Sequence, residues 1–224
     1  MKGLQVYQPP PYPIPSLPPF RAGGFYDASF PFCSTAPDVT LGTTDGWVIP
    51  TWIPAPSLLV NLGIEVTAKS AGAYARIGVY DAAYAWDAVR QRSVMVPYPD
   101  RLICETGAID TGSANGYMNG AVTYRNGYKK LPQGLCFVAF NQYVSVGTST
   151  LRAVGDAAYT GFFCCGFITS TNSALWNTRW GVLKITAFSL LKAPGWPLRF
   201  PFQSMAANQM QTGAQVHPHV VMEF

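Results

Sequence analysis

Apolar and polar residues alternate along two successive stretches in the first half of the chain, and this pattern constrains the fold more than any other feature. Every even-numbered residue from Leu58 to Val66 is apolar, and Ala73 to Tyr80 alternate in the same way. Alternation with a period of two is typical of strands that bury one face. A turn is expected at residues 69–72, so we predict that the two strands pair as a hairpin.

Similar short apolar runs continue along the chain, separated by Gly, Asn, Pro and Asp. This spacing is typical of a sandwich or barrel and not of βαβ units. No stretch has the length and caps of a stable helix. The fold class we predict is all-β: an antiparallel, jelly-roll-like β-sandwich over residues 47–192, with extended N- and C-terminal arms. The further strands are expected at residues 102–109, 120–124, 135–141, 150–154, 161–168 and 182–189.

The two ends of the chain are predicted to be extended arms. Residues 1–46 form a Pro-rich arm and connector, and residues 193–224 form a C-terminal arm. The first 20 residues contain seven of the 19 prolines, and proline lacks an N–H and fixes φ, which favours a polyproline conformation. A disordered tail is the alternative, but disordered segments usually lack aromatic residues. The candidate anchoring residues, which would dock on a neighbouring subunit, are Tyr7, Tyr12, Ile14, Leu17 and Phe20.

The composition favours a subunit of a larger assembly. Charged residues make up 12% of the chain, about half the usual ~25%, so partners are expected to cover part of the surface. The net charge of +4 is spread along the chain without the basic stripe that direct nucleic-acid binding needs. We expect no membrane insertion, because no apolar run reaches about 18 residues, and no signal peptide, because prolines interrupt the N-terminal region.

The five cysteines form neither an even set nor a metal-ligand spacing. Cys104 and Cys136 lie in apolar runs, where a free thiol behaves as a small apolar side chain. We predict buried, reduced thiols and synthesis in a reducing cytoplasm.

Residues that could support catalysis or bind a cofactor are sparse. Asp81 and Asp110 are expected to bond local backbone N–H groups in turns. The chain has two histidines, His217 and His219, near the C-terminus, where a rigid catalytic base is not expected. They could offer two imidazoles to a metal, but no further ligand lies close in sequence. We therefore predict no enzyme activity, no cofactor and no metal.

Aromatic residues concentrate in or near the predicted loops. Exposed Tyr and Trp beside Asn and Gly are typical of protein and carbohydrate recognition surfaces, although these residues could equally be core or rim residues. The candidate partner or host contacts are Tyr84, Trp86, Tyr98, Tyr117, Tyr124 and Tyr128.

Three motifs occur in an order that resembles a known module. They are Ile64-Glu65-Val66-Thr67, the strand from Arg76 to Tyr80, and the turn and strand from Leu131 to Phe137. Together they resemble a β-sandwich module of tailed-bacteriophage virion proteins, over roughly half of the chain. The chain departs from that module in a long insert at residues 82–100 and in Cys136, where an aromatic is common.

The resemblance implies a non-enzymatic virion structural protein that is made in the host cytoplasm. We expect a tail or fibre component that is anchored by the Pro-rich arm and has a possible contact with a host receptor. The alternative is a capsid decoration or minor head protein that stabilises the shell. Its partners would be other virion proteins and further copies of itself, with a trimer favoured.

Overall fold

The computed structural model describes residues 19–28, 38–40, 46–86, 95–144, 147–155, 183–185, 195–200, 210–212 and 216–224. All regular elements within these ranges are β-strands, and every strand pair is antiparallel. The prediction of an all-β, antiparallel, sandwich-like fold is confirmed. The expected strand at residues 161–168 lies outside the described residues.

One layer is built around β4, which has β8 on one edge and both β14 and β10 on the other. Strand β1 extends this layer beyond β14, whereas β2 and β13 pair with β10. The strands are β1 (Phe25–Asp27), β2 (Asp38–Thr40), β4 (Asn61–Ala68), β8 (Gly116–Tyr124), β10 (Thr150–Gly155), β13 (Val216–Pro218) and β14 (Val220–Glu223).

The other layer is built around β5, which lies between β6 and β9 and also pairs with β7. Strand β9 pairs with β3, and β11 and β12 follow at that edge. The strands are β3 (Gly46–Ile53), β5 (Ala73–Trp86), β6 (Met95–Thr106), β7 (Ile109–Asp110), β9 (Gly134–Val144), β11 (Leu183–Ile185) and β12 (Met210–Thr212).

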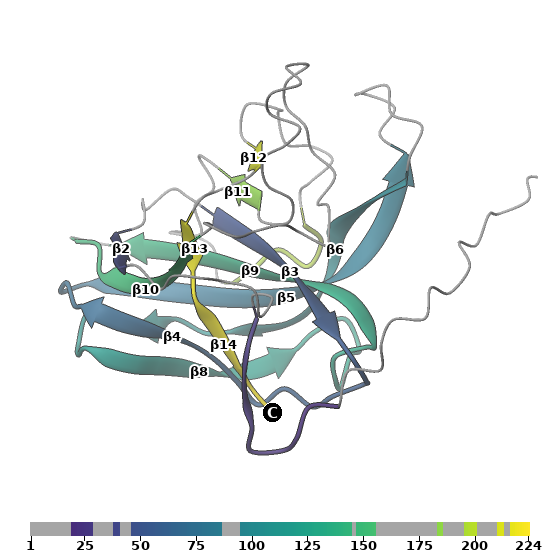
Figure 1. The fold of residues 1–224 in the computed structure, drawn as a ribbon, viewed down its shortest axis with the longest axis horizontal. Helices are drawn as coiled ribbons and strands as arrows, with labels where there is room; N and C mark the ends of the chain where they lie inside the picture. Colours follow the sequence, from purple (N-terminus) through teal and green to yellow (C-terminus); the bar gives the residue numbers. More distant parts are fainter. Residues whose placement is uncertain are drawn as a thin grey trace, which may run out of the picture.

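Strand β8 joins the two layers. Its first part pairs with β4, whereas Val122, Thr123 and Tyr124 pair with β6. The sheet therefore curls over the core like half of a barrel, as Figure 1 shows.

The prediction that the first two alternating strands form a hairpin was wrong. A turn is present at the expected place, with Gly72 at φ +76°, but β4 pairs with β8, β14 and β10, and β5 pairs with β6, β7 and β9. The turn instead carries the chain from one layer to the other. Both strands have one apolar face, and a strand buries such a face equally well by facing a neighbour across the core.

The alternation before β4 also has a different phase from the one we expected. Leu62, Ile64 and Val66 are buried, but Leu58 and Val60 are exposed and Leu59 is buried. Strand β4 starts at Asn61, so the residues before it are not held in the pleat that imposes the period of two.

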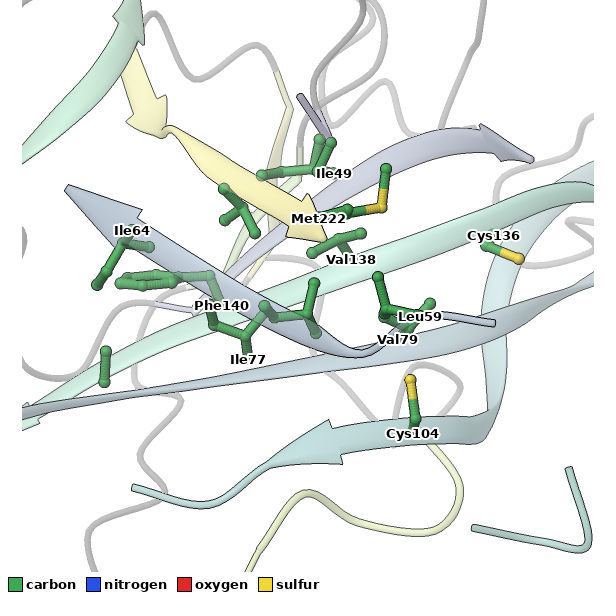
Figure 2. Packing of buried hydrophobic residues seen from close by; sticks show 14 of the residues in the cluster. Ile49, Leu59, Ile64, Ile77, Val79, Cys104, Cys136, Val138, Phe140 and Met222 are labelled. Atoms are coloured by element: carbon green, nitrogen blue, oxygen red, sulfur yellow. The ribbon is translucent and has the colours of Figure 1, made fainter. Parts of the chain in front are cut away.

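The core lies between the two layers (Figure 2). Strand β5 contributes Ile77 and Val79, and β9 contributes Val138 and Phe140; these side chains are fully buried. From the opposite layer, Ile64 belongs to the same cluster. Each strand presents alternate residues to this core, as a pleated strand must.

The last residues of the chain are part of the sheet and of the core. Strand β14 lies between β1 and β4, and Val220, Met222 and Phe224 are buried in the main cluster. Part of the stretch predicted to be a C-terminal arm is thus integral to the sandwich. Figure 1 shows β14 as a yellow arrow crossing the front of the molecule.

Candidate partner-binding surfaces

The expected insert at residues 82–100 is largely a β-hairpin and not a loop. Strand β5 continues to Trp86 and β6 starts at Met95, with Tyr84 opposite Pro97 and Ala83 opposite Tyr98. Figure 1 shows this hairpin projecting beyond the sandwich. It therefore places three of the candidate contact aromatics, Tyr84, Trp86 and Tyr98, on the projecting β5–β6 arm.

A polar cluster holds the base of this arm. The Asp81 carboxylate accepts the backbone N–H of Arg101 at 2.7 Å, the guanidinium of Arg101 at 3.1 Å and the hydroxyl of Tyr128 at 2.5 Å. The guanidinium also lies 5.7 Å from the centre of the Tyr128 ring. These contacts join β5, β6 and the segment after β8, where register shifts interrupt the β5–β6 ladder. They tie the base of the arm to the segment after β8.

The two aspartates expected in turns behave differently. Asp110 does accept the backbone N–H of Gly112, at 2.8 Å, so its local turn role is confirmed. Asp81 lies inside β5 and binds the neighbouring strand, so the local turn role predicted for Asp81 was wrong. Alternating strand geometry places its side chain beside Arg101 across the ladder, 20 positions further along the chain.

Because of the cluster of Asp81, Arg101 and Tyr128, we expect the protein to lose stability at high pH. Burial raises the pKa of Tyr128 to about 12, and the hydrogen bond and charge of Asp81 act in the same direction, against ~10 in the unfolded chain. This contribution to stability is fully present below pH ~10 and is lost as the pH rises toward 12. In urea unfolding at several pH values, the free energy of unfolding should decline less steeply with pH in Tyr128→Phe than in the unchanged protein. Equal declines in the two proteins would contradict the role of the hydroxyl.

The outer face of β5 near the arm is already covered by the chain itself. Tyr80 is fully buried, lies 5.1 Å from Phe200 and 6.1 Å from Trp196 between ring centres, and donates its hydroxyl to Pro197 O at 2.8 Å. Gly78 leaves room for the Trp196 ring, which lies 2.9 Å from where a Cβ would be. This part of the sheet is not available to a partner.

A buried carboxylate lies under the same segment. Glu105 accepts the backbone N–H of Trp196 at 2.8 Å and the Nε–H of Arg125 at 2.9 Å. Its two partners satisfy the charge that burial would otherwise penalise. This pair could not be predicted from the sequence, because Glu105 lies in the otherwise apolar end of β6 and Trp196 is 91 positions away.

The remaining candidate contact residues lie in two environments. Tyr124 and Tyr128 pack against the core, and the Tyr124 hydroxyl accepts the backbone N–H of Leu59 at 2.8 Å. Tyr117 is 42% exposed on the opposite layer, where its ring lies 6.1 Å from that of Phe25, edge to face. Phe25 is 62% exposed, and we did not predict it as a contact residue because it lies in an irregular Gly-rich stretch.

One candidate anchoring residue packs on its own chain. Phe20 stacks on Phe224 at 4.2 Å and contacts Tyr26 at 4.5 Å, between ring centres. The other four, Tyr7, Tyr12, Ile14 and Leu17, lie outside the described residues. Phe20 therefore marks the point at which the chain joins the sandwich after the Pro-rich residues 1–18.

Both thiols within the described ranges are buried and free, as predicted. Burial raises the pKa of Cys136 to about 12 and also raises the pKa of Cys104, so neither is a reactive thiolate at neutral pH. Cys33, Cys164 and Cys165 lie outside the described residues. Among the side chains that the structure describes, which include that of His219, no three His, Cys, Asp or Glu form a metal-binding group.

No helix among the described residues is long and apolar enough to cross a membrane. No family model, curated protein or solved structure matches this chain.

Proposed function

We propose that this chain is a non-enzymatic structural protein of a bacteriophage virion, associated with the tail or its fibres. The projecting β5–β6 arm is the observation that carries the proposal most directly. A two-stranded ribbon is marginal by itself in water, and here its base is held by Asp81, Arg101 and Tyr128. A projection that is held at its base and carries aromatic residues in its sequence suits contact with another macromolecule better than chemistry on a small molecule.

The organisation of the two ends supports the same proposal. The first described stretch begins at residue 19, and Phe20 in it stacks on Phe224, directly after the C-terminal strand. The Pro-rich residues before this point can leave the sandwich from a fixed place, and a stiff polyproline segment loses little entropy when it docks. In this proposal they anchor the protein to other virion proteins or to further copies, with a trimer favoured.

A head location is the second candidate. A capsid decoration or minor head protein would use the same layout to bridge neighbouring capsomers and stabilise the shell. The low charged fraction of 12% supports an assembly subunit in either location, because it leaves less charged surface for solvent.

Arm deletion tests the anchoring role. A tagged copy lacking residues 1–18 should be lost from purified particles when it is supplied during phage growth, whereas the tagged full chain should be incorporated. The circular dichroism of the two purified proteins should agree, because the described core begins after the deleted segment. Incorporation of the shortened copy at the level of the full chain would contradict anchoring by this arm.

Substitution on the projecting arm tests host contact. Trp86→Ala should reduce binding of the purified protein to host cells several-fold, because large aromatic side chains dominate recognition surfaces. Leu58→Ala is the control, since Leu58 is an exposed apolar residue just before β4, in the other layer. Equal binding by both variants would rule out the arm as the contact, and incorporation into particles would then favour the shell-stabilising role.

A further inference from the structure

The outer face of the β1–β14–β4–β8 layer carries an aromatic patch that our proposed function has not used. The patch consists of Phe25, Tyr117, Val221 and Ala121. Phe25 and Tyr117 are exposed and their rings are nearly perpendicular, at 87°. Val221 and Ala121 belong to the same face by strand alternation, since their neighbours Val220 and Met222, and Gly120 and Val122, point inward.

Tyr117 is held flat over the backbone of the neighbouring strand. A Cβ on Gly63 would clash with the Tyr117 ring, so glycine at this position lets the ring lie over β4. Glu223, which accepts a hydrogen bond from Asn61 at 2.9 Å, places a negative charge at this patch. Burial and then the charge of Glu223 raise the pKa of Tyr117.

We infer that this patch binds the Pro-rich N-terminal arm, residues 1–18, of a second copy of the chain. Pro-rich segments dock in aromatic-lined grooves in known recognition domains, and the rings of Phe25 and Tyr117, 6.1 Å apart and nearly perpendicular, offer aromatic faces of that kind. The arm is rich in proline and tyrosine, carries Lys2 and contains no acidic residue. Its charge is therefore complementary to Glu223.

The position of Phe20 favours a second copy over the chain's own arm. Phe20 packs against Tyr26 and Phe224, which belong to the cluster around the core. Tyr26 and Phe25 are successive residues of β1, so their side chains face opposite sides of the sheet. The arm therefore starts on the inner side of the edge strand, whereas the patch lies on the outer side. This inference rests on the assembly role proposed above and adds the site that receives the arm.

Photo-crosslinking of the full chain tests the inference. Phe25 is replaced by p-benzoylphenylalanine, and copies with two different tags are mixed at high concentration and irradiated. Crosslinks should join position 25 of one copy to residues 1–18 of the other, several-fold above the yield from the same replacement at Leu198. Gly63→Ala should lower this yield several-fold, because its new methyl group displaces the Tyr117 ring.

Each other outcome overturns the inference. Crosslinks confined to one tag would show that the chain's own arm occupies the patch, and crosslinks to another region would show a different occupant. A yield equal to that at Leu198 would show that nothing docks there. A protein that enters virions but fails this test would leave the proposed function intact and remove only the docking site.

Discussion

Deleting residues 220–224 should prevent the chain from folding. The deletion removes β14 from its place between β1 and β4. It also removes Val220, Met222 and Phe224 from the core, and full burial of each such side chain is worth ~1.5–3 kcal/mol. The sum reaches the ~5–15 kcal/mol that typically separates a folded domain from its unfolded state.

Loss of β14 would also release the start of the described chain. The N–H of Ala28 donates to Val220 O at 2.8 Å, and among the described strands β1 pairs with β14 alone. Phe20 would lose its stacking partner Phe224. The deletion therefore dismantles an edge of the sheet as well as part of the core.

The far-ultraviolet circular dichroism and thermal melt of the shortened protein test this prediction. We expect no cooperative melt. Two point variants that keep the full chain length test core burial by itself. Met222→Ser should destabilise the protein strongly because this side chain is 1% exposed, whereas Val221→Ser on the outer face should have a small effect. A deletion variant with an unchanged melting temperature would mean that β14 does not belong to the fold.

Phe140→Ala should lower the free energy of unfolding by about 3–5 kcal/mol, the usual cost of removing a large buried aromatic ring. Phe140 is fully buried on β9 and belongs to the same cluster as Ile64 and Ile77. Figure 2 shows its ring in the space between the strands of the two layers. Truncation leaves a cavity that the surrounding strands, fixed by their hydrogen bonds, can fill only in part.

Urea unfolding provides the measurement, with Phe25→Ala as the matched control. Both variants remove the same atoms, but Phe25 is 62% exposed, so its change should stay within ~0.5 kcal/mol. The melting temperature of Phe140→Ala should fall by roughly 6–20 °C. Similar losses in the two variants would contradict the burial of Phe140.

The strands were predictable from the sequence because alternation directly reflects burial of one face. The pairing of β4 with β8 instead of β5 could not be predicted. The apolar pattern is the same whether two strands pair within one layer or face each other across the core. The alternation that we extended back to Leu58 was out of phase with the observed burial for a related reason. Residues outside the hydrogen-bonded ladder do not obey the period of the strand, and the sequence does not mark where the ladder begins.

The candidate contact residues were predictable only as a class. Composition suggested recognition aromatics, but it could not separate exposed Tyr117 from Tyr124, whose hydroxyl is bonded to the backbone of Leu59. Phe25 is a candidate contact residue only because β1 lies beside β14. Contacts between residues far apart in sequence decide such cases, as with Glu105 and Trp196, and a single sequence carries no local signal for them.

Gold labelling of intact virions, read by electron microscopy, tests the central claim most directly. An antibody against the purified chain should label particles at the tail or its fibres, at regularly repeated positions. Label spread over the head would replace the tail location with the decoration role. Particles that carry no label, from a preparation whose lysate contains the protein, would contradict the claim that it is part of the virion.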